Sequence, residues 1–227
     1  MRKYMKRLMV LAAVLVMAVS AVPVSAENIT YGKAYVYLQK QVKNKADRID
    51  IGMYHPKKDT FTYNKSMATV KAYASSSWGG YKYYAFYPKK AGKTTLTIKC
   101  KSEATFIKGT LKYPFVILNY TNPVAAVRLG GSLVPGSKFN NTDRITVNYN
   151  KFSKKTNTFK FVPKKGWTVW SVEAVNKAGK TVDDVYMRFS KNKKSFKAKG
   201  GKGNYTLRIR LQNNKTMAYE SVEIAFK

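Results

Sequence analysis

The sequence predicts an all-β protein, made of two tandem β-sandwich domains that follow a cleaved signal peptide. Three observations predict this fold. Apolar and polar residues alternate with a period of two in many short segments after residue 26, as they do in strands with one buried face. Turn-forming residues separate these segments, and no segment after residue 26 has a helical stripe. Finally, a series of features occurs twice along the chain.

The first 26 residues have the three regions of a secretory signal. Four cationic residues lie within residues 1–7, Leu8–Val22 is apolar, and Val24-Ser25-Ala26 supplies the small residues that signal peptidase requires. The apolar run is about 15 residues long, which is too short for a comfortable membrane span. We therefore expect cleavage before Glu27. The mature protein would be secreted, extracellular or loosely attached to the cell wall, with no transmembrane segment.

The mature chain is predicted to be strongly cationic. The whole chain has 43 Lys and Arg residues and 11 Asp and Glu residues. Four of the cations and none of the acids lie in residues 1–26, so a formal charge of +28 remains. The chain is 44% hydrophobic and has 17 Tyr and 11 Phe residues, enough to build cores, so its charge does not indicate disorder. An exported protein with this charge is attracted to anionic surfaces.

The predicted strands follow in order along each half. The alternation indicates strands at residues 48–53, 81–87, 92–100 and 111–118, and then at 144–149, 203–211 and 221–226. Turns are predicted at residues 55–58, 78–80, 88–92, 163–166 and 200–203. Pro114 lacks an N–H group for the ladder, so it predicts an edge strand or a bulge. Cys100, the single cysteine, continues the apolar alternation of Leu96 and Ile98, which predicts a buried, unreactive thiol.

Four features recur in the same order and define two copies of one unit. They are Asp47–Ile51 with Asp143–Val147, Asp59–Phe61 with Asn157–Phe159, Gly92–Ile98 with Gly203–Ile209, and Leu111–Leu118 with Ser221–Phe226. The first domain is therefore predicted at residues 27–118 and the second at 119–227. The polar stretch Asn119–Pro123 ends in proline and is typical of a linker.

The run Ala91–Ile98 resembles the closing strand of bacterial immunoglobulin-like domains of the Big type. Such strands have a glycine, small residues and an alternating T-x-I/V pattern, and about seven strands per unit fits an immunoglobulin-like sandwich. The second copy departs from the pattern at Tyr205 and Arg208. The resemblance implies an extracellular spacer, adhesion module or accessory domain, and such domains rarely catalyse reactions. Abundant Lys, Asn and Tyr, with no possible intramolecular disulfide, favour a Gram-positive source.

The sequence predicts no catalytic residue, no metal site and no cofactor. His55 is the only histidine, and it lies beside a Pro-Lys-Lys turn. Asp183 and Asp184 are the only adjacent acids; they leave a calcium site open, with an ordinary turn as the alternative. An enzyme or enzyme inhibitor remains a third possibility, which a cleft with paired carboxylates or a bound metal would favour.

Basic residues are the first candidates for binding. The expected partners are anionic cell-wall or host polymers, with no specific recognition of nucleic acid, because lysine greatly outnumbers arginine and favours diffuse attraction. The alternative is a generally solvated basic surface. Three Pro-Lys-Lys turns and one long basic run supply the candidates: Lys57, Lys58, Lys89, Lys90, Lys164, Lys165, Arg188, Lys191, Lys193, Lys194, Lys197, Lys199 and Lys202.

The aromatic residues in the segment 78–87 are the second candidates for binding, because they could stack on glycans. A strand here would place Tyr81, Tyr83 and Tyr87 on one face and Tyr84 and Phe86 on the other, so some rings should be exposed. The candidates are Trp78, Tyr81, Tyr83, Tyr84 and Tyr87. The alternative is that these tyrosines simply pack on half-buried strands.

Overall fold

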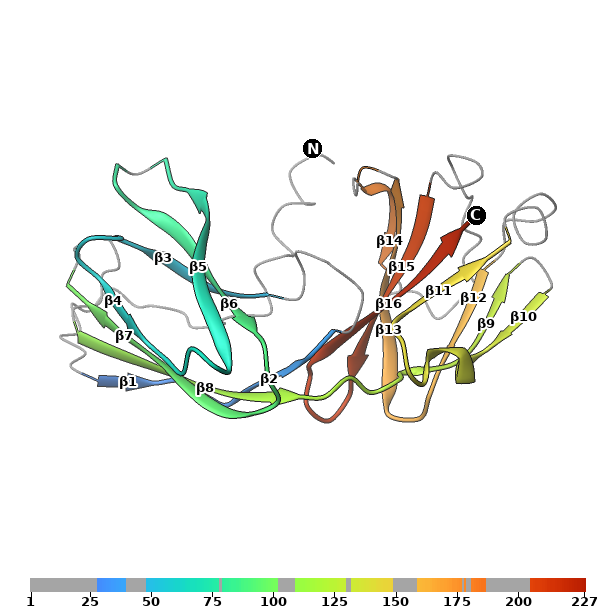
Figure 1. The fold of residues 1–227 in the computed structure, drawn as a ribbon, viewed down its shortest axis with the longest axis horizontal. Helices are drawn as coiled ribbons and strands as arrows, with labels where there is room; N and C mark the ends of the chain where they lie inside the picture. Colours follow the sequence, from blue (N-terminus) through green and yellow to red (C-terminus); the bar gives the residue numbers. More distant parts are fainter. Residues whose placement is uncertain are drawn as a thin grey trace.

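The computed structural model describes residues 28–39, 48–77, 79–101, 109–129, 132–148, 159–176, 178, 181–186 and 205–227. The predicted signal peptide lies outside these residues. The described part is all-β, with strands β1 to β16 and one short 3-10 turn, η3 (Gly136–Phe139). The strands form four sheets, two from strands up to β8 and two from β9 onward (Figure 1). Each pair of sheets forms an immunoglobulin-like sandwich.

The first sandwich packs a five-stranded sheet against a three-stranded sheet. The larger sheet contains β1 (Asn28–Thr30), β2 (Ala34–Tyr37), β8 (Gly109–Leu118), β7 (Gly92–Cys100) and β4 (Thr60–Thr62). The smaller sheet has the order β3 (Ile49–Tyr54), β6 (Lys82–Pro88) and β5 (Ala68–Ser75).

The core of the first sandwich comes from the inward residues of both sheets. Phe86 of β6 stacks on Phe115 of β8 with their ring centroids 4.1 Å apart, which joins the two sheets. Leu96, Ile98 and Cys100 alternate along β7 and are buried, as the period-two pattern predicts. The buried, unpaired state of Cys100 is therefore confirmed.

Pro114 does not mark an edge strand, contrary to the expectation from sequence. Strand β8 lies inside its sheet, antiparallel to β7 on one side and parallel to β1 and then β2 on the other. The carbonyls of Lys112 and Leu118 accept bonds from Tyr31 and Leu38 on that second side, so alternate residues of β8 point their backbone groups toward it. Pro114 shares this parity and falls between the β1 and β2 pairings, where no ladder bond requires an N–H group.

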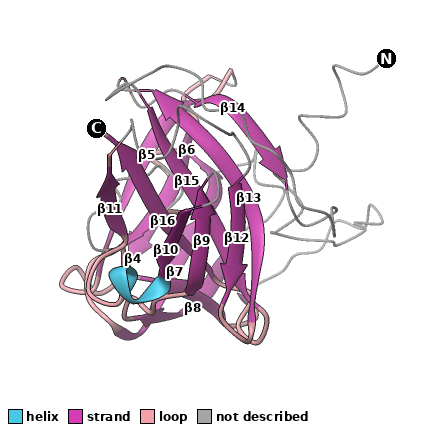
Figure 2. Ribbon diagram, turned by 90° about the vertical axis from the view of Figure 1, so that its right-hand side faces the viewer, coloured by secondary structure: helices cyan, strands magenta, loops and turns pink. Residues whose placement is uncertain are grey.

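The second sandwich is also built from two sheets. One has the order β10 (Ser132–Pro135), β9 (Val124–Leu129) and β12 (Phe159–Pro163). The other has the order β11 (Arg144–Val147), β16 (Tyr219–Phe226), β15 (Tyr205–Asn213), β13 (Trp167–Asn176) and β14 (Thr181–Tyr186). Figure 2 shows this sandwich facing the viewer, with η3 at its lower end. Val127, Leu129, Phe139, Leu207 and Ile209 are among the residues that fill its core.

The internal similarity holds for the closing strands but not for the opening ones. Strands β7 and β8 pair in the same antiparallel way as β15 and β16. However, β11 is parallel to its closing strand β16, and in the first sandwich that position belongs to β2, whereas β3 pairs with β6. Strands β4 and β12 do not correspond either. Strand β4 pairs with β7, in the sheet that holds the closing strands, whereas β12 pairs with β9 in the other sheet of its sandwich. The match of Asp47–Ile51 with Asp143–Val147, and of Asp59–Phe61 with Asn157–Phe159, is therefore wrong as a structural correspondence.

Side chains from the end of β2 join the two sandwiches. Tyr37 belongs to the core of the second sandwich, where its ring lies 5.5 Å from that of Trp167 and its hydroxyl accepts a bond from Asn213 Nδ2 at 3.2 Å. Two residues later, Gln39 Nε2 donates to Glu220 Oε2 at 2.7 Å. The other oxygen of Glu220 accepts a bond from the backbone N–H of Thr121, in the segment that connects β8 to β9. We call this set of contacts the joint.

We predict that Tyr37→Ala lowers the free energy of unfolding by about 3 kcal/mol, because it leaves a hole in the second core. Chemical denaturation of the mature chain measures this change. Tyr35→Ala, two residues earlier and 37% exposed, is the matched control and should cost clearly less, about 1 kcal/mol. Equal losses in the two variants would contradict a role for Tyr37 in the second core.

Candidate binding surfaces

The charges of the described residues are divided between interior and surface. Every lysine among them is exposed. By contrast, four carboxylates are buried, those of Asp59, Asp143, Glu220 and Glu223. A ligand at the surface can therefore touch the lysine ammonium groups directly, but it cannot touch these four carboxylates.

Each buried acid with described partners has a structural role. Asp59 accepts bonds from the backbone N–H groups of His55 at 2.7 Å and Lys101 at 2.8 Å, which closes the turn after β3 and holds the end of β7. Glu220 belongs to the joint. These hydrogen bonds offset the cost of removing a carboxylate from water.

Arginine, rather than lysine, makes the ion pairs that the structure describes. Arg208 donates from Nε and Nη2 to one oxygen of Glu223, at 3.0 and 2.8 Å, and its Nη1 lies 3.6 Å from Glu173. Arg144 lies 3.5 Å from the second oxygen of Glu223. The planar guanidinium suits such multiple contacts.

Two of the three Pro-Lys-Lys turns lie at the junction of the sandwiches. Gly92, which follows Lys89 and Lys90, pairs with Ile117 near the end of β8. The backbone N–H of Lys164 donates to the carbonyl of Pro123, where the connection enters the second sandwich. Both turns lie along the lower edge of the molecule in Figure 1. We call Lys89, Lys90, Lys164 and Lys165 the junction lysines.

The third turn lies at the opposite end of the first sandwich. Tyr54 pairs with Lys82, so the turn holding Lys57 and Lys58 adjoins the start of β6, whereas Lys89 follows its end. Seven residues of strand separate these ends by about 20 Å. Asp59 accepts a bond from Lys101 N, so the end of β7 is at the same place. We call Lys57, Lys58, Lys99 and Lys101 the distal lysines.

Part of the predicted set lies outside the described residues. This holds for Trp78 and for the whole basic run, namely Arg188, Lys191, Lys193, Lys194, Lys197, Lys199 and Lys202. These candidates remain predictions.

The predicted tyrosines divide between the two faces of β6. Tyr83 is 40% exposed on the outer face, and Tyr87 shares that face. Tyr84 packs on the core, 4.6 Å from the ring of Phe61, which removes it from the stacking candidates. Tyr81 precedes the strand and meets the ring of His55 edge-on at 5.2 Å.

Sequence reasoning missed the residues that flank these tyrosines in space. Tyr73 of β5 is 36% exposed, and its ring lies 6.2 Å from that of Tyr83. The guanidinium carbon of Arg48 lies 3.5 Å above Tyr73, and Lys71 Nζ lies 4.7 Å from the ring centroid of Tyr87. The sequence patterns did not predict β5, and only strand pairing places Tyr73 and Lys71 beside β6.

His55 supports its own turn rather than a described reactive site. Nδ1 of His55 accepts the backbone N–H of Lys57 at 3.2 Å, so the imidazole supports its own turn. Among the residues whose side chains are described, no three His, Cys, Asp or Glu groups come together as metal ligands. The backbones of Asp183 and Asp184 lie in β14 opposite β13, and their side chains lie outside the described set.

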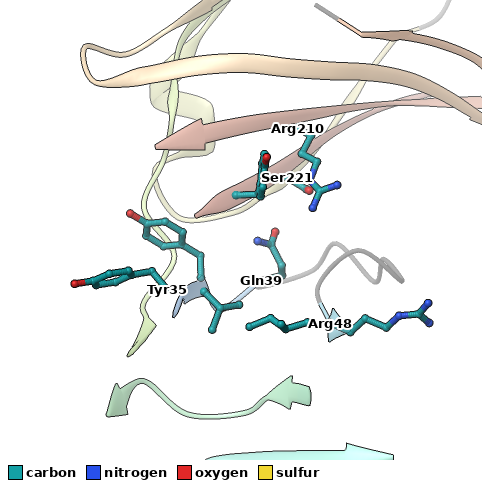
Figure 3. A pocket seen from close by; sticks show the side chains of 9 residues that line it. Tyr35, Gln39, Arg48, Arg210 and Ser221 are labelled. Carbon is teal, nitrogen blue, oxygen red and sulfur yellow. The ribbon is translucent and has the colours of Figure 1, made fainter. Parts of the chain in front are cut away.

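A small cavity lies between the sandwiches, beside the joint (Figure 3). Its volume is about 80 Å³, against roughly 300–1,000 Å³ for sites that enclose a small molecule. Tyr35, Gln39 and Arg48 line it from the first sandwich, and Arg210 and Ser221 from the second. A space of this size suits several water molecules rather than a sugar ring.

The described part of the chain has no helix that is long and apolar enough to cross a membrane.

Comparisons with known proteins return similar structures but no family. No protein-family model matches the sequence, and no curated protein matches it significantly. The fibronectin(III)-like modules of Clostridium thermocellum CbhA are 13% identical, with 77% of this chain and 88% of theirs covered and a TM-score of 0.23. Domains 5–6 of the S-layer protein SbsC are 15% identical, with 75% and 81% covered and a TM-score of 0.25. The Yersinia pseudotuberculosis adhesin InvE is 11% identical, with 86% and 56% covered and a TM-score of 0.20.

We predict that Cys100 is protected from alkylation while the protein is folded. Burial, with a smaller effect of nearby Asp59, raises the pKa of its thiol from 9.0 to about 11. Because only the thiolate reacts, labelling by iodoacetamide at pH 8 should be about 100-fold slower than in denaturant. Mass spectrometry of timed samples measures the two rates. Equal rates would show that the thiol is exposed.

Proposed function

We propose that this chain is a non-enzymatic, secreted or cell-surface binding module that anionic polymers retain through its lysines. The division of charges carries the proposal: the described lysines are all exposed, while four carboxylates are buried. Such a surface attracts polyanions over about a Debye length, without a shaped pocket.

The junction lysines are the best-placed described candidates for this contact. They come from both sandwiches, and the joint holds strands of the two sandwiches together beside them. An extended polymer could therefore contact both halves at once, which raises its affinity above that for either half. With a Gram-positive source, cell-wall teichoic acids are the first candidate polymers; host glycosaminoglycans, anionic lipid head groups and extracellular DNA are others.

A second candidate function is binding of carbohydrate. The exposed rings of Tyr73 and Tyr83 favour it, because aromatic faces stack on the C–H faces of sugars. Salt dependence separates the two, since ring stacking responds weakly to ionic strength.

We predict that polyphosphate, used as a phosphate-polymer probe, binds with an affinity that falls steeply as NaCl rises. Replacing the four junction lysines by glutamine should reduce the magnitude of the negative slope of log K against log[NaCl] by about 3. Replacing the four distal lysines removes the same charge and should lower it by less than half as much. Fluorescence anisotropy titrations at several salt concentrations measure these slopes.

Two results would contradict the proposal. Polyphosphate binding that survives molar salt unchanged would exclude charge as the mechanism. Equal slopes for the junction and distal variants would mean that the lysines act as a diffuse surface, and would overturn the assignment to the junction.

A further inference from the structure

The outer face of the β3-β6-β5 sheet carries a cluster of rings and charges. We call it the tyrosine face, and its members are Arg48, Asp50, Lys71, Tyr73, Tyr83 and Tyr87. They come from β5, β6 and the start of β3, which the register brings together around Ala85.

Ala85 shows how closely these side chains cover the face. It has no exposed surface, yet it does not belong to the core cluster of the first sandwich. Asp50 and Lys71 are its partners on the two neighbouring strands, and Tyr83 and Tyr87 lie two residues away along β6. The long side chains around Ala85 therefore cover it completely and form one continuous surface.

Two cations on this face are held against rings. Arg48 stacks on Tyr73 with its guanidinium carbon 3.5 Å from the ring centroid, and its Nε donates to Asp50 Oδ1 at 2.9 Å. These two contacts fix the plane of the guanidinium and direct its recognition to the two terminal nitrogens. Lys71 is held in the same way over Tyr87, at 4.7 Å.

We propose that the tyrosine face binds a polysaccharide whose sugar rings carry carboxylate groups, that is, a uronate polymer. The inference rests on the proposed function and names the chemistry of one of its ligands. Tyr83 offers an exposed ring on which the C–H face of a sugar can stack. Arg48 and Lys71 lie on the same face and can pair with the carboxylate, which the guanidinium binds in a planar, bidentate way.

The combination of groups selects this ligand class. A polyol-phosphate chain has charge but no ring to stack, and a neutral glycan offers no anion to the terminal nitrogens of Arg48 or to the Lys71 ammonium. Each sugar of a uronate polymer supplies both a ring that can stack and a carboxylate. Charge complementarity and ring stacking thus point to the same polymer.

Three soluble probes separate these contributions in isothermal titration calorimetry of the mature chain. Oligogalacturonate carries sugar rings and carboxylates, its methyl ester carries the rings alone, and poly-glutamate of equal charge carries carboxylates alone. Oligogalacturonate should bind about tenfold more tightly than either control.

Variants locate the site. Tyr83→Ala should weaken oligogalacturonate binding about tenfold, whereas Tyr83→Phe keeps the ring and should bind as the wild type does. Arg48→Lys keeps the charge but loses the planar fork, and should also weaken binding. Tyr35→Ala, another exposed tyrosine outside this face, is the matched control and should have no effect. Thermal unfolding of each variant confirms that it is folded.

The outcomes distinguish this inference from the proposed function. Equal affinity for oligogalacturonate and poly-glutamate, or unchanged binding by Tyr83→Ala, would overturn the uronate site while salt-dependent polyanion binding stands. Equal binding of the methyl ester would overturn it in favour of a neutral glycan site. Failure of polyphosphate, poly-glutamate and oligogalacturonate alike would overturn both proposals.

Discussion

Burial of carboxylates determines what the surface of this protein can do. A carboxylate that leaves water must be matched by donors, and here those donors are backbone N–H groups for Asp59 and two arginines for Glu223. The scarce acids are thus used in turns, ladders and the joint. Lysine is left as the main exposed charge, so the same interactions that order the fold also produce its cationic exterior.

Local alternation predicts strands such as β7, β8 and β16 because it reflects a local constraint, but it did not predict β5 or β13. Each strand has one face in a core, and the pattern around Leu96, Ile98 and Cys100 reports that face directly. Alternation does not predict which strands pair, since pairing depends on contacts between distant segments. The resemblance of Asp47–Ile51 to Asp143–Val147 therefore reflects two half-buried strands rather than one position in the fold, and Pro114 is tolerated inside a sheet because two short strands share its side.

The candidate surfaces were predictable to different degrees. Pro-Lys-Lys turns expose lysine wherever they occur, so their exposure follows from sequence alone. Which turns lie at the same end of a sandwich depends on the directions of the strands. The strand directions place Lys57 and Lys58 at the opposite end of the first sandwich from Lys89 and Lys90. The same applies to the tyrosine face. Alternation correctly separated Tyr83 from Tyr84, but the approach of Arg48 to Tyr73 joins residues 25 positions apart and needed the sheet.

The position of Tyr37 has a consequence for how such a protein can evolve. Tandem modules are often shuffled as independent cassettes, which requires that each unit be complete between its own ends. Here the core of the second unit includes an aromatic ring from β2 of the first unit, and Glu220 is bonded by an amide from the residues that follow β2. Recombination at the connecting segment would separate these groups from the second unit, which depends on them. Inheritance of the two halves as a pair is therefore favoured over exchange of either one.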